Sequence, residues 1–82
     1  MFSDKSVKIF DMNKNLIGKG YLLSLSPEVI MVKGTNLPVL NSSKEIIIEI
    51  YNELKGISQY LCHVNIASVN QLNALITRKK PA

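Results

Sequence analysis

Branched aliphatic residues alternate with polar ones along this chain, and turn-forming residues interrupt the alternation about every eight to twelve positions. The clearest run is Glu45–Tyr51, where Ile46, Ile48 and Ile50 fall on one face of an extended strand. Isoleucine occurs ten times and valine six times, whereas alanine, the best helix former, occurs three times. Because branched side chains pack well on a pleated surface, pattern and composition together predict an all-β fold.

The pattern predicts six strands joined mostly by connections of hairpin length. The 82 residues are enough for one small domain. A flat sheet of this size would leave exposed edges, which closure into a barrel removes. We therefore expect a small six-stranded antiparallel barrel or split barrel, arranged as a meander, over residues 1–77, and a basic tail or truncated linker over 78–82. The expected strands are Lys5–Asp11, Leu16–Leu25, Val29–Lys33, Glu45–Tyr51, Ile57–Ala67 and Leu72–Thr77.

The last of these segments also fits a helix. Ser68 and Gln71 are spaced like a helix capping box. Against this, Leu72, Ala74 and Ile76 alternate as they would in a strand. The strand is favoured, and both alternatives stay open on the sequence alone.

Three glycines and one long loop are expected to shape the barrel and its core. Gly18 and Gly20 lie inside one expected strand, which is typical of a bulge or of sharp coiling at a barrel corner. Gly56 is expected at a left-handed position in the hairpin that follows Tyr51. The longest irregular stretch, Thr35–Lys44, is expected to fold back and plug one end of the core through its apolar residues, which are Leu37, Val39 and Leu40.

The net charge of +4 is concentrated at the end of the chain. Without Arg78, Lys79 and Lys80, positions 1–77 hold seven basic against six acidic residues. A nucleic-acid-binding domain would spread its basic residues over a face of the fold, so nucleic acid is not an expected partner. The three terminal residues are candidates to hold a phosphate group or another anionic ligand.

The sequence has few residues with which to build a catalytic or metal site. Cys62 and His63 are the only cysteine and histidine, and neighbouring strand residues point to opposite faces. We therefore expect Cys62 in the core, His63 on the surface, and neither a metal site nor a cofactor. No other residues suggest a nucleophile with its base, and the chain is not expected to be an enzyme.

The compartment is predicted from what the sequence does not contain. A single cysteine forms no internal disulfide, and no apolar run approaches the roughly 20 residues that cross a bilayer. Residues 1–5 have no apolar signal core behind their charges. These features predict a cytoplasmic location without membrane insertion.

One expected strand has a second face that is partly apolar. Ile47 and Tyr51 share it with Glu45 and Glu49, so it is expected to be half-exposed and to serve as an interaction surface. Tyr51 could instead join Tyr21 and Tyr60 in a platform on which nucleic-acid bases stack, but the glutamates beside Tyr51 would repel phosphates.

The order of strands and turns resembles the N-terminal barrel that precedes the PilZ domain in flagellar-brake-type regulators. The resemblance covers about residues 5–77 and rests on a pattern of strands rather than on invariant polar residues. It is carried by Val7–Ile9, Gly18–Leu25, Val29–Gly34, Leu37–Leu40, Ile46–Tyr51 and Tyr60–Val64.

The resemblance implies a role in signalling by the bacterial second messenger cyclic di-GMP. PilZ domains bind this nucleotide through an RxxxR motif and a [DN]xSxxG motif. Here Arg78 is the only arginine, and Ser26 matches the motif serine while Ser24 and Val29 replace its flanking residues. Ser26 and the terminal basic residues are thus candidate ligand-binding positions, but the nucleotide is expected to bind only if the arginine motif is supplied downstream.

We therefore expect a non-catalytic regulatory or interaction domain of a PilZ-like cyclic-di-GMP signalling protein. In such proteins the N-terminal barrel packs against the PilZ domain that follows, so the expected partner is that domain or another protein. The alternative is a small OB- or SH3-like barrel that binds nucleic acid through Tyr21, Tyr60 and the basic end. A third expectation is an oligomer in which an edge strand pairs across subunits.

Overall fold

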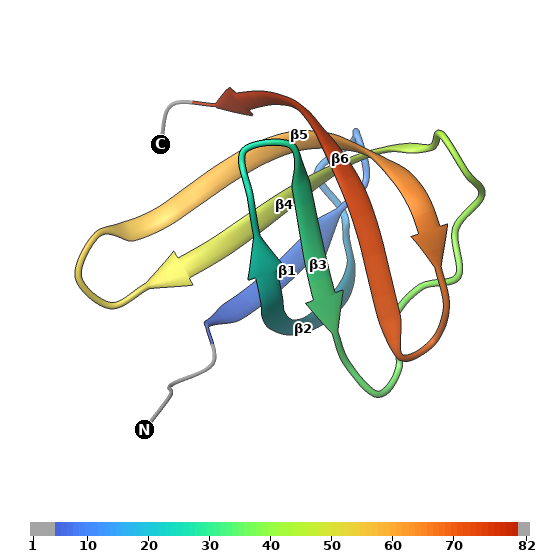
Figure 1. Cartoon of the computed structure of the whole chain (residues 1–82), viewed down its shortest axis with the longest axis horizontal. Coiled ribbons are helices and arrows are strands. Elements are labelled where there is room, and N and C mark those ends of the chain that lie inside the picture. Colours follow the sequence, from blue (N-terminus) through green and yellow to red (C-terminus); the bar gives the residue numbers. More distant parts are fainter. Residues whose placement is uncertain (1–4, 81–82) are drawn as a thin grey trace.

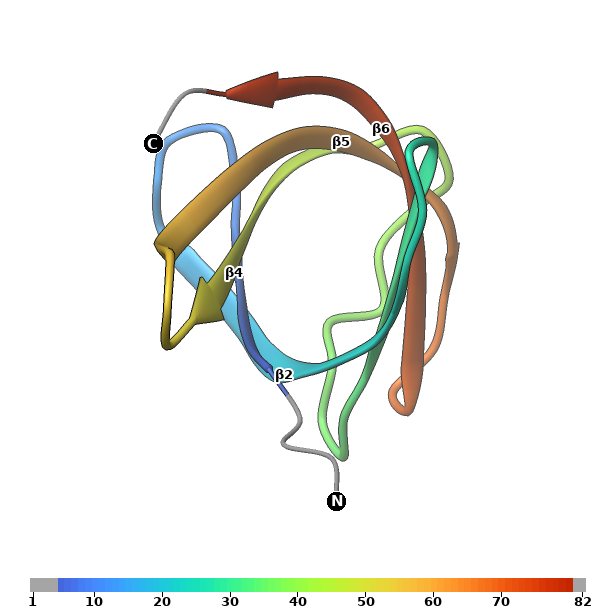
Figure 2. The ribbon, with the colours of Figure 1, turned by 60° about the vertical axis from the view of Figure 1, so that its left-hand side comes forward.

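The computed structural model describes residues 5–80 and folds them into a closed barrel of six antiparallel strands (Figures 1 and 2). No helix occurs among these residues, so none there could cross a membrane. The all-β class and the six-stranded barrel are confirmed. The strands are β1 (Ser6–Phe10), β2 (Leu16–Leu25), β3 (Val29–Lys33), β4 (Glu45–Asn52), β5 (Gly56–Ala67) and β6 (Gln71–Lys80).

The strand order around the barrel is β1-β2-β3-β6-β5-β4. It consists of two three-stranded meanders, β1–β3 and β4–β6, that meet along two seams. One seam pairs β1 with β4 and the other pairs β3 with β6. The simple meander predicted from the sequence is therefore wrong at one connection, because β3 and β4 are not neighbours. A loop at residues 34–44 carries the chain between them across one end of the barrel.

Alternate residues of the strands point into the barrel and form its core. On the β1–β4 seam, Val7 pairs with Ile50 and Ile9 with Ile48, so their side chains meet inside. The face of β4 predicted to be buried, which carries three isoleucines, lies in this core. The buried cluster comprises Val7, Ile9, Ile30, Val32, Leu37, Ile46, Ile48, Ile50, Tyr60, Cys62, Val64, Leu72 and Ala74.

The two glycines of β2 make room for other parts of the chain. A Cβ on Gly18 would lie 2.6 Å from Cδ of Pro38, and a Cβ on Gly20 would overlap the carbonyl oxygen of Lys33. The pairing of β1 with β2 also shifts register next to Gly18, between Ile9 and its neighbour. The predicted bulge is therefore present, and close packing is the reason that both positions are glycine.

The loop at residues 34–44 plugs the barrel, as predicted, through part of its apolar content. Leu37 is 2% exposed, and its backbone N–H donates to the Val69 carbonyl at 2.9 Å. Leu40 packs against the core beside it. Val39 is 66% exposed, so the prediction is wrong for this residue.

The segment that fitted both a helix and a strand is strand β6. The Ser68 hydroxyl accepts the backbone N–H of Gln71 at 3.1 Å and closes a tight turn between β5 and β6, where the sequence also allowed a helix cap. Strand β6 continues to Lys80, three residues beyond the predicted end at Thr77. Arg78 pairs with Leu61 in this extension.

Candidate functional site

Acidic residues are unevenly distributed among the strands. Strands β1, β2 and β3 carry Lys8, Lys19 and Lys33 and no aspartate or glutamate. Strand β4 carries Glu45 and Glu49 and no lysine, whereas β6 ends in three basic residues. The meander β1–β3 therefore has strands with basic side chains only.

Lys8 and Lys19 are directly opposite each other on β1 and β2. Lys8 also pairs in register with Glu49 of β4, but the Glu49 carboxylate accepts a 2.6 Å hydrogen bond from the amide of Gln59. Among the residues that the structure describes, no ion pair forms to either lysine. Lys8 and Lys19 are both exposed and lie side by side on this face, with Glu49 flanking Lys8 on the β4 side.

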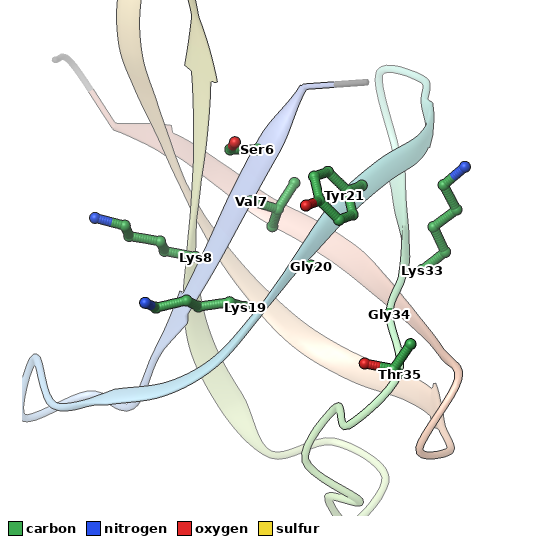
Figure 3. Close-up of a pocket in the computed structure, with 9 residues that line it drawn as sticks. All are labelled: Ser6, Val7, Lys8, Lys19, Gly20, Tyr21, Lys33, Gly34 and Thr35. Atoms are coloured by element: carbon green, nitrogen blue, oxygen red, sulfur yellow. The ribbon is translucent and has the colours of Figure 1, made fainter. Parts of the chain in front are cut away.

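Tyr21 lies one row further along the same face, where it pairs with Ser6 of β1 and Lys33 of β3. Its side chain is 51% exposed. In Figure 3 the side chains of Lys8 and Lys19 extend in one direction from β1 and β2, and Lys33 lies on the other side of Tyr21. Together with their neighbours they line a hollow of about 670 Å³, which we call the lysine hollow: Ser6, Val7, Lys8, Lys19, Gly20, Tyr21, Lys33, Gly34 and Thr35.

A second candidate surface lies on the hairpin of β4 and β5. Tyr51 and Ile57 are paired across the two strands and are 50% and 47% exposed, and Leu54 in the turn is 94% exposed. The Asn52 side-chain oxygen accepts the backbone N–H groups of Leu54 and Lys55 and so fixes the shape of the turn. We call Tyr51, Leu54 and Ile57 the hairpin surface.

Ile47, which the sequence grouped with Tyr51, is only 5% exposed. It points away from the core, and its partners on the neighbouring strands are Phe10 of β1 and Leu61 of β5. These large residues leave little of it accessible. Of the two predicted contact residues, only Tyr51 presents a side chain to a partner.

Two of the predicted anion-binding residues, Ser26 and Arg78, lie on elements that contact each other. Ser26 is in the turn between β2 and β3, and its hydroxyl accepts the Val29 N–H at 3.1 Å. That turn contacts β6, where the Ile76 N–H donates to the Glu28 carbonyl at 2.8 Å. Arg78 is exposed two residues further along β6. The side chains of the two terminal lysines, Lys79 and Lys80, lie outside the described part of the structure.

The other residues singled out from the sequence occupy clear positions. Tyr60 is 8% exposed and faces the core, so it is not available to stack on a base beside Tyr21. Cys62 is buried in the core as predicted, and burial raises the pKa of its thiol to about 12. His63 is half-buried on the opposite face. Residues 5–80 contain no group of three cysteine, histidine or acidic side chains placed to hold a metal ion.

The lysine hollow was not predicted from the sequence, because its residues come from three separate segments. Lys8 and Lys19 are eleven positions apart, and only the register of β1 against β2 brings them together. The signal available in the sequence was the absence of acidic residues from the first three expected strands.

Comparison of the chain with protein-family models, with curated proteins and with solved structures finds no match in any of the three. The resemblance to PilZ-associated barrels therefore rests on the strand pattern of the sequence alone, and the structure shows a small six-stranded antiparallel barrel.

Proposed function

We propose that this chain is a non-catalytic regulatory domain of a PilZ-like cyclic-di-GMP signalling protein, and that it acts by docking onto a PilZ domain. The small closed barrel supports the proposal, because the resembling N-terminal modules are barrels of this kind. The observation that carries the docking role is the hairpin surface, which exposes three large apolar side chains on a single hairpin.

The hairpin surface is placed to reach a partner. Strand β4 pairs with β1 only as far as Ile50, so the end of the β4–β5 hairpin projects past the barrel wall (Figure 1). Single exposed apolar residues are common, but a contiguous apolar patch marks an interaction site. Covering its three side chains would contribute on the order of 3 kcal/mol before the cost of association.

The charges around this surface indicate the chemistry of the partner. Glu49 lies two residues before Tyr51 on the same face of β4, and Glu53 is in the adjoining turn. Carboxylates beside an apolar contact are complementary to basic side chains on the partner. The two arginines of the RxxxR motif of a PilZ domain would supply such side chains.

The chain is proposed not to bind cyclic di-GMP by itself. Arg78 is its one arginine, whereas the nucleotide motif of PilZ domains needs two. Ser26, the residue that matches the motif serine, uses its hydroxyl to close its own turn. Nucleotide dependence would therefore enter through the partner domain.

Calorimetric titration of the chain with a PilZ domain that carries both nucleotide motifs tests the proposal. We expect saturable binding that Tyr51→Lys weakens at least tenfold, because the variant places a charge in the apolar contact. Ile66→Lys is the matched control, since Ile66 is also an exposed apolar residue but lies nine residues beyond Ile57 along β5, and it should bind like the unmodified chain.

Three results would overturn this function: no binding to the PilZ domain, equal losses in the two lysine variants, or saturable binding of cyclic di-GMP to the chain alone. Light scattering on each variant reports whether the hairpin surface instead joins two copies of the chain. A dimer that Tyr51→Lys dissociates, without PilZ binding, would also contradict the proposal.

A further inference from the structure

We infer that the lysine hollow binds single-stranded nucleic acid, with Lys8 and Lys19 contacting phosphates and Tyr21 stacking on a base. This site goes beyond the docking function and is centred on β1 and β2, next to the hairpin surface on β4 and β5. It also differs from the nucleic-acid surface considered from the sequence, because Tyr60 is in the core.

The first argument is the unneutralised lysine pair. Like charges directly opposite each other on paired strands are destabilising, and Lys8 and Lys19 are such a pair. Glu49, in register with Lys8 on β4, accepts a hydrogen bond from Gln59 at 2.6 Å, and Lys19 has no acidic neighbour on β1 or β3. A phosphate between the two ammonium groups would convert their repulsion into two charge-assisted contacts.

The second argument is the placement of Tyr21 relative to these lysines. Tyr21 is two residues beyond Lys19 on the same face of β2, which puts the ring roughly 7 Å from the lysine row. Its neighbour on β1 is Ser6, whose small side chain leaves that side of the ring open. A base can therefore stack on Tyr21 while its phosphate lies over the lysine pair, the combination that single-stranded binders use.

The third argument is the shape of the hollow. Its floor includes Gly20, which has no side chain, and the Lys33–Thr35 segment borders it on the β3 side (Figure 3). About 670 Å³ is within the range of small-ligand sites, which suits a base with its phosphate rather than a duplex. Strands β1, β2 and β3 carry no acidic residue, and the carboxylate nearest by register is Glu49 of β4, on the far side of Lys8 from Lys19.

Fluorescence anisotropy with labelled single-stranded RNA and DNA of about 12 nucleotides tests the site. We expect saturable binding at about 50 mM salt that weakens steeply toward about 200 mM. In the double variant Lys8→Ala/Lys19→Ala, the slope of log K against log salt should fall by about 1.4, because two phosphate contacts are lost. The control Lys44→Ala/Lys55→Ala removes the same charge away from the hollow and should bind like the unmodified chain.

Two further variants separate charge from stacking. Lys19→Glu would give Lys8 an ion-pair partner, so we expect an unchanged or higher melting temperature together with loss of binding. Tyr21→Ala should weaken binding about tenfold, whereas Tyr21→Phe, which keeps the ring, should not.

The inference is overturned if neither oligonucleotide binds at low salt, or if the two double-lysine variants lose affinity equally. It is also overturned if poly-glutamate competes as well as the oligonucleotide does, because the face would then recognise acidic polypeptides instead. Leu54→Ala, at the tip of the hairpin, changes no charge and should leave oligonucleotide binding intact while it weakens docking, so failure of this site and failure of the docking function are distinguishable.

Discussion

Gly20 and Gly56 exclude a side chain for two unrelated physical reasons. Gly20 has an ordinary strand conformation, but a Cβ there would lie 2.9 Å from Cγ1 of Val32 and would overlap a backbone carbonyl. Gly56 has a φ of +81° with open space around it, so only its backbone conformation disfavours a side chain. The first constraint is tertiary and the second is local.

These reasons predict different costs for the same substitution. Gly20→Ala should lower the free energy of unfolding by about 3 kcal/mol, because the barrel wall has to shift. Gly56→Ala should cost about 1 kcal/mol, and Gly56→Asn less, since asparagine tolerates the left-handed region. Urea denaturation of the three variants checks this order. An Asn variant at position 56 that is less stable than the Ala variant would argue against the conformational explanation.

The buried thiol of Cys62 predicts a loss of stability at alkaline pH. Burial raises its pKa from the ordinary 9.0 to about 12, so the unfolded chain loses this proton first. Between pH 9 and 12 the unfolded state is therefore favoured progressively, and the Cys62 contribution to the free energy of unfolding falls by about 1.4 kcal/mol per pH unit. Cys62→Ala should remove this part of the slope. If the free energies of unfolding of the two proteins, measured by urea denaturation, fell in parallel with pH, the alkaline loss of stability would not come from Cys62.

At the scale of elements, the main contribution of the loop at residues 34–44 to the core is the side chain of Leu37. Leu37 is buried and bonded to Val69, whereas Val39, two residues away, is exposed. Leu37→Ala should cost 2–5 kcal/mol of unfolding free energy because it leaves a cavity at the barrel end. Val39→Ala should change stability by about 0.5 kcal/mol or less. Similar melting temperatures for the two variants would show that the loop does not plug the barrel.

The strands themselves follow from local patterns in the sequence, and their partners do not. Alternation in Glu45–Asn52 is a property of neighbouring residues, so this strand and its buried face were predictable. The seam between β3 and β6 joins residues about forty positions apart, such as Ile30 and Ala74, which no short pattern specifies. The spacing of Ser68 and Gln71 was also ambiguous in the sequence. A serine oxygen accepts the N–H three residues later in a tight turn as well as at a helix cap.

The exposure of a candidate site residue was predictable where it depends on a single strand. Tyr51 is exposed on the face expected from alternation alone. The same reasoning did not show that Ile47 is covered, because Phe10 and Leu61 come from two other strands. The lysine hollow depends on strand register throughout, so the charge count along the chain did not reveal it.

At the scale of the whole molecule, closure of two meanders into one barrel gives the protein two surfaces of opposite character. The β4–β5 hairpin presents apolar side chains bordered by carboxylates, and β1 with β2 presents lysines beside a tyrosine. The two surfaces adjoin along β1, because Ser6 and Lys8 of the lysine hollow also line a second, smaller hollow with Tyr51 and Ile57. A variant at the tip of the hairpin, such as one at Leu54, is thus expected to affect the hairpin surface alone.

The most direct test of the docking function maps the contact on the isotope-labelled chain by NMR. Titration with a PilZ domain that carries both nucleotide motifs should shift backbone amide signals in residues 51–57, and cyclic di-GMP added alone should shift none. Shifts confined to β2 and β3, or shifts caused by the nucleotide without the PilZ domain, would contradict the account.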